Sequence, residues 1–227
     1  SLSYNNGTKF SNRVLFKIIK FNLLKRTSIK KVNSILEQHP NWKILDIGCG
    51  YRAHKSASVI ADIQDFSNFY KQKNFVQIKE KKLPFKDKEF DFVISSHVIE
   101  HVEDFEFFIR ELERISSKGY IELPSRFGDN LVFENKKDHI WWFVFDDVSN
   151  HLIASKKNQL IDPFITVSMA KVFEEIFRES MVIELIWEKK IDYIIDNKIA
   201  QNNFKKISFL RIFRKYFSKK IRTIFKR

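Results

Sequence analysis

The sequence contains little cysteine, glycine and proline, and it has no long run of apolar residues. Its single cysteine, Cys49, excludes a disulfide within the chain and suits a reducing compartment, so we expect a cytoplasmic protein. No apolar stretch reaches the roughly 20 residues that are needed to span a bilayer. Lys17, Lys20 and Lys25 interrupt the apolar runs near the start of the chain, so we expect no signal peptide there.

The chain has 227 residues, of which 44% are hydrophobic and 30% are charged, a composition typical of one globular domain. Its net charge of +13 is concentrated at the two ends. Residues 1–43 carry nine Lys/Arg and one acid, and residues 198–227 carry eleven Lys/Arg and no acid, whereas residues 44–197 carry 21 basic and 27 acidic side chains. A nucleic-acid enzyme more often spreads positive charge around its cleft, so nucleic acid is the less favoured partner.

The order of the apolar runs predicts an α/β fold, in which strands of a parallel sheet alternate with helices or loops. Strands are expected at residues 42–47, 58–62, 75–78, 90–95, 120–123, 182–187 and 191–195, the last two joined tightly. Helices are expected at residues 104–115, capped at the end by Gly119, and at residues 166–179. Residues 125–160 are interpreted as irregular.

Both basic ends of the chain have helical periodicity. Residues 10–38 are interpreted as amphipathic helix in one or two pieces, and Thr27 or Ser28 is available to cap a second piece. In residues 203–227, apolar side chains fall on one helical face and Lys and Arg surround it, which suits the surface of an anionic membrane. RNA binding and packing against the N-terminal helix are the two other interpretations of this segment.

The most informative segment is residues 43–50 (KILDIGCG), an apolar strand that ends at a carboxylate and two glycines. Glycine at the carboxyl end of a strand allows a sharp turn and lets a ligand lie against the backbone. The segment continues to Ala53 in formal agreement with the dinucleotide-binding pattern G-x-G-x-x-G/A. Taken alone, the loop leaves both cofactor binding and an ordinary tight turn open.

Four further motifs follow this loop in order, and they are Ala61-Asp62-Ile63, Leu83-Pro84-Phe85, Phe90-Asp91-Phe92-Val93 and Val98-Ile99-Glu100-His101-Val102. Together with the loop they resemble the class I S-adenosylmethionine-dependent methyltransferases, and most closely the type-11 group. The resemblance covers about residues 42–124 and extends weakly to Phe143. Five motifs in order are more specific than one glycine loop, so a nicotinamide cofactor is far less favoured.

The resemblance implies a Rossmann-like sheet that is mostly parallel with an antiparallel last strand, flanked by basic helices, and it implies S-adenosylmethionine as the cofactor. The cofactor-binding residues that it implies are Asp46, Gly48, Cys49, Gly50, Asp62, Ile63, Ser96 and His97. Among them, Asp62 would hold the ribose diol and Ile63 would pack on the adenine. Ser96 and His97 would lie beside the sulfonium.

Three features depart from the family pattern. Arg52 stands where a third glycine is usual. Only sixteen residues lead from Asp46 to Asp62, so a loop or a single turn is expected where a helix usually lies. The acid expected shortly before Leu83 is absent, and Glu80 is an offset candidate for contact with the adenine amine.

The candidate catalytic residues are His139 and His97. In similar methyltransferases an acid–His pair followed by an aromatic side chain lies near the acceptor pocket, as Asp138 and His139 would here. His139 would act as a base or bind the acceptor, or else anchor an aromatic loop, and His97 would lie near both substrates. Glu100 and His101 are interpreted mainly as structural. No Cys/His cluster has metal-ligand spacing, so we predict no zinc site, although a divalent ion held by carboxylates stays open.

We therefore expect methyl transfer to an oxygen, or less favourably a nitrogen, of a small-molecule or a glycan- or lipid-linked acceptor. The protein would work in the cytoplasm, peripherally on the inner face of the membrane. An RNA methyltransferase that uses its basic ends, and a non-catalytic binding protein with the same fold, are the alternatives. The expected division is a basic helical region at residues 1–40, a cofactor-binding domain at 41–200 and a basic amphipathic helix at 201–227.

Overall fold

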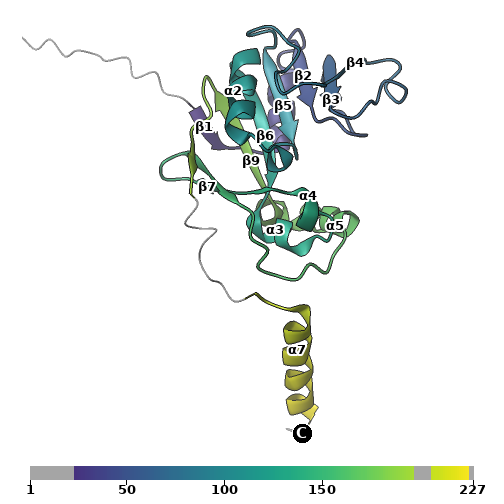
Figure 1. Cartoon of the computed structure of the whole chain (residues 1–227), viewed down its shortest axis with the longest axis vertical. Coiled ribbons are helices and arrows are strands. Elements are labelled where there is room, and N and C mark those ends of the chain that lie inside the picture. The colour runs from purple at the N-terminus through teal and green to yellow at the C-terminus, as the bar shows by residue number, and fades with distance from the viewer. Residues whose placement is uncertain (1–22, 197–205, 225–227) are drawn as a thin grey trace, which may run out of the picture.

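The computed structural model describes residues 23–196 and 206–224, and Figure 1 shows their arrangement. A seven-stranded sheet has the strand order β1-β9-β6-β5-β2-β3-β4. Its strands are β1 (Leu23–Arg26), β2 (Ile44–Ile47), β3 (Val59–Asp62), β4 (Asn74–Gln77), β5 (Phe92–Ser96), β6 (Lys118–Pro124) and β9 (Val182–Glu188). Neighbouring strands run parallel except at β9, which is antiparallel to β6 and to β1. The predicted Rossmann-like sheet with an antiparallel late strand is confirmed.

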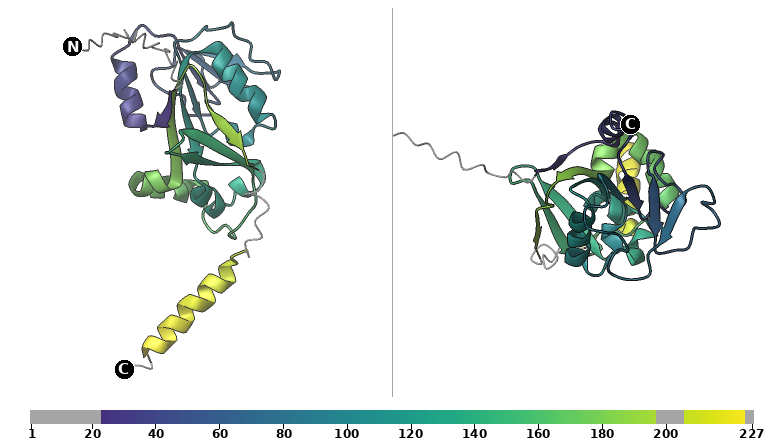
Figure 2. Two further views of the ribbon diagram at one scale, coloured as in Figure 1. Left: turned by 90° about the vertical axis from the view of Figure 1, so that its left-hand side faces the viewer. Right: turned by 90° about the horizontal axis from the view of Figure 1, so that it is seen from above.

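Helices cover both faces of this sheet, with α1 and α2 on opposite sides in Figure 2. The elements that cover it are α1 (Ile29–Glu37), the 3₁₀ helix η1 (Ile99–His101), α2 (Phe105–Ile115) and α5 (Val167–Met181). Successive strand side chains point to opposite faces. Ile44 and Phe92 therefore pack with α1, whereas Leu45 and Val93 pack with α2. Each such side chain contributes about 1.5–3 kcal/mol when it is fully buried.

Each of the longer helices of the domain begins at a capping side chain. The side-chain oxygens of Ser28, Asp104 and Thr166 accept hydrogen bonds from the backbone N–H three residues later, at 3.1–3.3 Å. These bonds satisfy donors that the first turn of a helix otherwise leaves unpaired. The sequence predicted two of these helix starts, and it offered Ser28 as one of two possible caps.

A second sheet, of three strands, corrects the interpretation of residues 125–160 as irregular. In order, this region contains α3 (Arg126–Leu131), α4 (Asn135–Asp138), β7 (Trp141–Asp146) and β8 (His151–Lys156). The predicted strand at 191–195 is β10 (Tyr193–Ile195), but it pairs with β8 rather than with β9. Because Trp141, Trp142 and Phe143 are all buried, β7 lacks the polar–apolar alternation that marks a strand with one exposed face.

The segment before α1 is also corrected. The helix predicted for residues 10–38 does not include Leu23–Arg26, which form the edge strand β1 paired with β9, and residues 10–22 lie outside the described residues. Leu24 is buried beside the core rather than on a helix face. Since α1 also packs on the sheet, the described residues of the predicted N-terminal region contact the sheet of the predicted cofactor-binding domain.

Within the predicted C-terminal basic segment, the structure has the helix α7 (Phe209–Ile224). Residues 201–205 and 225–227, which were assigned to the same segment, lie outside the described residues. Within residues 23–196 and 206–224, no helix has both the length and the apolar character that crossing a bilayer requires.

Gly119 does not cap α2 as expected. The helix ends at Ile115, the next residue, Ser116, has extended backbone, and Gly119 lies inside β6. A Cβ on Gly119 would lie 2.5 Å from the carbonyl oxygen of Val93 and 2.6 Å from Nε1 of Trp187. Glycine is required there because a neighbouring backbone and an indole leave no room for a methyl group.

We expect Gly119→Ala to lower the free energy of unfolding by about 1–3 kcal/mol, because the added methyl group overpacks the strand. Urea unfolding followed by tryptophan fluorescence measures the change. Lys190→Ala, an exposed position beyond β9, is the control and should shift the midpoint little. Equal stabilities for Gly119→Ala and the native chain would contradict the packing argument.

Candidate functional site

The loop after β2 turns sharply at two glycines. Gly48 and Gly50 have φ angles of 72° and 48°, which side chains with a Cβ rarely adopt. A Cβ on Gly48 would lie 2.2 Å from the side chain of Val98, so a larger residue does not fit. At Gly50, by contrast, no described atom lies within 4 Å of such a Cβ, and the backbone faces open space. As predicted, residues 48–58 contain turns and no helix.

Two buried carboxylates hold this loop. Asp62, at the end of β3, accepts hydrogen bonds from the backbone N–H groups of Gly50 at 3.0 Å and of Gln64 at 2.9 Å. Asp46 accepts one from the N–H of His54 at 2.7 Å, and burial raises the pKa of Asp46 to about 6. Each carboxylate therefore ties the end of a strand to the backbone that follows it.

A mainly apolar cavity, of about 640 Å³, opens beside the loop. The predicted cofactor residues that line it are Gly48, Gly50, Asp62, Ile63 and His97. Most of its other walls are apolar. They come from the residue after β4, from the loop at residue 83, from both flanks of η1 and from α2, and they include Ile78, Leu83, Val98, Val102, Phe107 and Phe108. A cavity with apolar walls and a carboxylate at one end fits a flat base attached to a sugar. Glu80, the offset candidate for the adenine amine, also lines this cavity.

A second cavity, of about 690 Å³, lies under α5 and the start of α1. The predicted cofactor residues that line it are Asp46, Gly48, Cys49, Ser96 and His97. Four cationic side chains also reach it, namely Lys30, Arg52, Lys171 and Arg178. All eight predicted residues thus line one or both of two adjoining cavities, which share Gly48 and His97.

A third cavity, of about 310 Å³, lies between η1 and the segment that contains α3 and α4. His97, His101 and His139 line it, together with Lys171 and Glu174 of α5. His97 also lines both larger cavities, so the two candidate catalytic residues share one cavity next to the predicted cofactor site.

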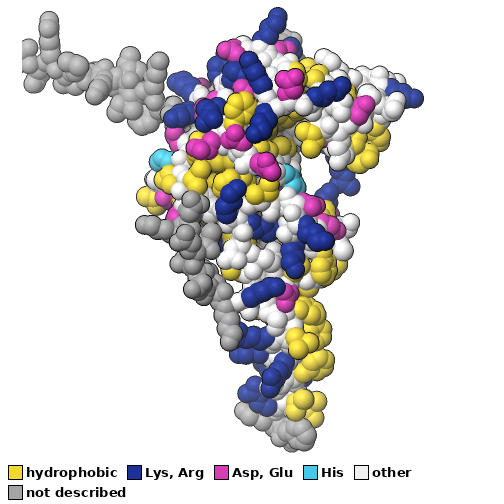
Figure 3. Space-filling model, in the orientation of Figure 1, with side chains coloured by type: hydrophobic (Ala, Val, Ile, Leu, Met, Phe, Trp, Pro, Cys, Tyr) yellow, Lys and Arg dark blue, Asp and Glu magenta, His cyan; other side chains and the backbone are white. Residues whose placement is uncertain are grey.

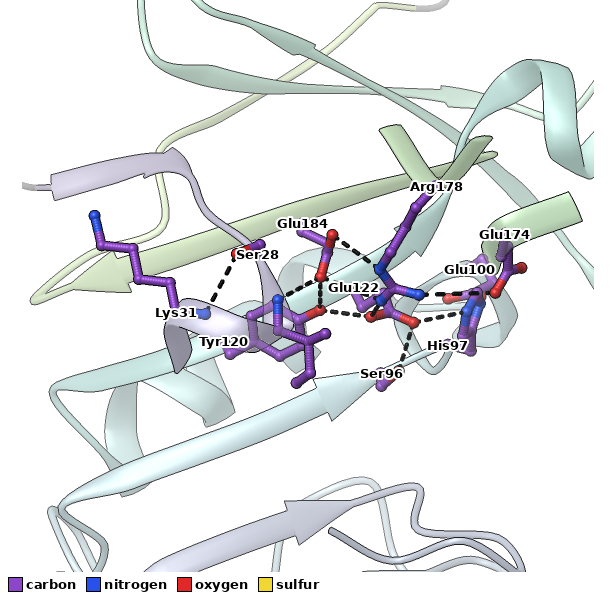
Figure 4. A network of polar contacts seen from close by, with 11 residues as sticks. Ser28, Lys31, Ser96, His97, Glu100, Tyr120, Glu122, Glu174, Arg178 and Glu184 are labelled. Carbon is purple, nitrogen blue, oxygen red and sulfur yellow. Dashed lines mark hydrogen bonds and ion pairs between the residues drawn. The ribbon is translucent and has the colours of Figure 1, made fainter. Parts of the chain in front are cut away.

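His97 stands at the junction of the three cavities with φ 54° and is held by two carboxylates (Figure 4). Its Nδ1 lies 3.2 Å from Oε1 of Glu100, and its Nε2 lies 3.1 Å from Oε1 of Glu122. Burial lowers the pKa of His97, but the two carboxylates outweigh that effect and raise it to about 10. The ring is therefore a cation at neutral pH that donates hydrogen bonds from both nitrogens.

The contacts of His97 continue through Glu122 into a larger network, also drawn in Figure 4. Arg178 of α5 pairs with Glu122 and lies 3.0 Å from Glu184 of β9. The hydroxyl of Tyr120 lies 2.5 Å from Glu122 and 2.8 Å from Glu184. Although burial raises the pKa of Glu122, His97, Tyr120 and Arg178 lower it to about 2. The network joins β6, β9 and α5 around the second cavity.

His139 is buried, and its Nδ1 pairs with the carboxylate of Asp129. That carboxylate also accepts hydrogen bonds from Nε1 of Trp142 at 2.6 Å and from Nζ of Lys157 at 2.8 Å. The ring of His139 meets the ring of His101 edge-on, with centroids 4.6 Å apart. Asp129 thus fixes the orientation of His139 at the wall of the third cavity.

Sequence reasoning did not find several residues that build the site, namely Tyr70, Asp129, Lys157, Arg178 and Glu184. The hydroxyl of Tyr70, for example, donates to the carbonyl of Gly50 at 2.9 Å. These side chains lie in no quoted motif, and only the folding of distant segments brings them to the sheet edge. Glu122 of β6 also lines the second cavity.

Comparison with known proteins adds independent findings. A family model described as a methyltransferase domain matches residues 45–121. The chain is 31% identical over 125 residues to the ubiquinone biosynthesis O-methyltransferase of Pelagibacter ubique, and the match covers 48% of this chain and 51% of that protein. It is 30% identical over 222 residues to the uncharacterized protein MJ0638 of Methanocaldococcus jannaschii, covering 89% of this chain and 87% of that protein. The chain thus spans about half the length of the first relative and most of the second.

Solved structures that resemble this chain have lower sequence identity to it than these relatives. An S-adenosylmethionine-dependent methyltransferase of Thermotoga maritima, described as a possible histamine N-methyltransferase, has 13% identity and a TM-score of 0.43, with 71% of this chain and 89% of that chain covered. One from Archaeoglobus fulgidus has 17% identity and a TM-score of 0.40, with 71% and 95% covered.

We expect Asp62→Asn to weaken the binding of S-adenosylmethionine and S-adenosylhomocysteine roughly 10- to 100-fold, since hydrogen bonds to a charged group contribute about 1.5–3 kcal/mol. Calorimetric titration measures the two dissociation constants. Asp65→Asn removes an exposed carboxylate from the next turn and is the matched control. If the two variants bind equally well, Asp62 does not contact the cofactor.

Proposed function

Because the chain belongs to the class I S-adenosylmethionine-dependent methyltransferases, whose methyl donor is S-adenosylmethionine, we propose that it methylates a small-molecule or a glycan- or lipid-linked acceptor. The acceptor atom would be an oxygen, or less favourably a nitrogen. The relative that is named an O-methyltransferase supports oxygen. The active site would be the sheet edge where the three cavities meet.

The residues present fit the cofactor. The cavity of about 640 Å³ suits adenosine, with the carboxylate of Asp62 at the ribose and Ile63, 73% exposed, free to pack on the base. The methionine part would pass Gly48, where a Cβ does not fit, toward the cations Lys30 and Arg52 of the second cavity. When bound, the cofactor supplies a sulfonium methyl group that transfers by in-line displacement.

One observation supports this proposal most directly: His97 and His101 line both the apolar cavity and the third cavity. An acceptor in the third cavity would therefore adjoin the cofactor. Since in-line displacement depends mainly on alignment, the chain would contribute by positioning the reactants. His97, held by the carboxylates of Glu100 and Glu122, would help to position the reactants. His139, whose ring is oriented by Asp129, stays the predicted contact to the acceptor.

The C-terminal helix supports a membrane-associated acceptor. Within Phe209–Ile224 there are six Lys/Arg and no acid, and in Figure 3 the hydrophobic side chains of this helix gather along one edge while cations lie on the other. Leu210, Phe217 and Ile224 are 80%, 54% and 69% exposed, so the described part of the chain leaves this apolar face uncovered. A helix of this kind lies in the interface of an anionic bilayer. We therefore propose a peripheral position on the inner face of the membrane, in the cytoplasm.

The start of α7 is attached near the third cavity. The backbone of Ile207 pairs with Leu160 and Asp162, and Lys206 lies 2.6 Å from Asp162. The segment that contains Leu160 and Asp162 leads into α5, whose first residue, Val167, lines the third cavity. A helix anchored there would hold that side of the protein toward the membrane, where a lipid-linked acceptor would be found.

We expect the full chain to release S-adenosylhomocysteine only when an acceptor is supplied, tested with pools of lipid-linked glycans, free glycans and small molecules. His139→Asn should lower turnover about 10²- to 10⁴-fold, since a general base that acts on the acceptor typically contributes this much. The affinity for the cofactor should change little, because the proposed contact of His139 is to the acceptor. His39→Asn, at the opposite end of β2, is the control. Cofactor binding without turnover on any pool would refute catalysis and favour the binding-protein alternative.

We expect the triple variant Lys215→Gln, Lys219→Gln, Lys220→Gln to bind vesicles that contain anionic phospholipid roughly 100-fold more weakly, since each cation contributes about 1 kcal/mol. Vesicle flotation measures the binding, and vesicles of neutral lipid should retain little of either protein. Thr223→Ala on the same helix is the control. Equal flotation of both variants would contradict the membrane proposal, and salt-sensitive RNA binding without flotation would favour the RNA alternative.

A further inference from the structure

Three side chains at the wall between the apolar cavity and the third cavity have the geometry of metal ligands. A carboxylate oxygen of Glu100 and one ring nitrogen each of His101 and His139 all lie within 4.8 Å of one another. Ligand atoms that share an ion at about 2.1 Å lie roughly 3–3.5 Å apart. A small side-chain adjustment would therefore bring the three atoms into one coordination shell.

The carboxylate of Glu100 points independently to a cation. Its side chain is completely buried, and Oε1 pairs with His97. Within the described part of the chain, Oε2 has no hydrogen-bond partner. An unpaired oxygen of a buried carboxylate is costly unless a cation or a donor satisfies it.

Both histidines have one nitrogen occupied and one available. Nδ1 of His101 lies 2.9 Å from the carbonyl oxygen of Asp138, and because a carbonyl only accepts, this nitrogen carries the proton. Nδ1 of His139 pairs with Asp129 in the same way. In the neutral form of each ring, Nε2 then has the lone pair that a metal ion needs. A metal-binding histidine usually donates its other N–H to a carbonyl or a carboxylate, which is the arrangement found here.

The two segments that carry these residues are joined by hydrogen bonds. The N–H of Ile140 donates to the carbonyl of Glu100 at 2.8 Å, and Nε1 of Trp141 donates to the carbonyl of Val102 at 2.8 Å. The three side chains are therefore held together by the backbone of η1 and the start of β7. His101 is exposed and leaves the site open to solvent.

We propose that Glu100, His101 and His139 bind a divalent transition-metal cation. Two imidazoles and one carboxylate favour Zn²⁺, Co²⁺ or Mn²⁺ over Mg²⁺, which prefers oxygen ligands. If the function proposed above holds, the ion would lie at the wall of the acceptor cavity, where it would orient the acceptor oxygen and ease loss of its proton. No zinc site was predicted from the sequence, since no Cys/His cluster has metal-ligand spacing there. His139 lies far along the chain from Glu100 and His101.

The test is a titration of the full chain with Co²⁺, using protein without a polyhistidine tag that has been treated with a chelator. We expect one Co²⁺ per chain, seen in its visible absorption, displacement of that Co²⁺ by Zn²⁺, and no displacement by Mg²⁺. His101→Ala and Glu100→Gln should each weaken Co²⁺ binding by more than tenfold, and Asp129→Asn by about 10- to 100-fold. His39→Ala should bind as the native chain does.

Cofactor calorimetry and urea unfolding on the same samples show whether each variant is folded, and the exposed His101 is the substitution expected to perturb folding least. Native protein that binds Co²⁺ no more tightly than His101→Ala overturns the proposal. Tight Co²⁺ binding by a protein that methylates no pool refutes the proposed function and leaves the metal site supported. Methyl transfer that survives both the chelator and His101→Ala refutes a role for the ion in the reaction.

Discussion

The two ion pairs of His97 hold together the edge of the sheet on which the cavities depend. Its backbone, at φ 54°, turns the chain from β5 toward η1, and its ring lies between Glu100 and Glu122. One pair fixes η1 and the other fixes the end of β6. Because His97 lines all three cavities, loss of either pair would change the shape of the predicted cofactor site and of the proposed acceptor site together.

Burying these charged side chains is unfavourable, since the transfer of an ion out of water costs several kcal/mol of free energy unless protein partners replace the solvent. Here Arg178 supplies the cation that Glu122 and Glu184 need, and the N–H of Ile29 donates to Glu184 at 2.7 Å. Only Ala170 and Met181 of α5 are buried. These ion pairs therefore add to the apolar packing of Ala170 and Met181 in holding α5 over the second cavity.

A second polar cluster, centred on Asp129, organises the opposite wall. Its carboxylate is fully buried and receives Lys157, Trp142 and His139, so a charge inside the protein is balanced by one cation and oriented donors. Although burial raises the pKa of Asp129, His139 and Lys157 keep it below its usual value. The carboxylate thus stays ionised and holds the ring of His139 in one orientation. A rigid ring is what either an acceptor contact or a metal ligand requires.

The sequence by itself determined the elements whose signals are local. Residues 43–50, Asp62 and the apolar runs predicted the central strands and the glycine turn. These features depend on backbone conformation and on burial of both faces of a strand, which a few neighbouring residues specify. Even the absence of a helix after Gly50 followed from the short spacing to Asp62.

Only the tertiary structure decided the rest. It made Leu23–Arg26 an edge strand, because β9 offers unpaired backbone groups there, and it made β7 a buried strand within a region that had been interpreted as irregular. It also brought His139 to His101, and Arg178 to Glu122, across long stretches of chain. Ion pairs and shared cavities depend on which distant segments lie side by side in the folded chain, and a local pattern of residues does not predict those contacts.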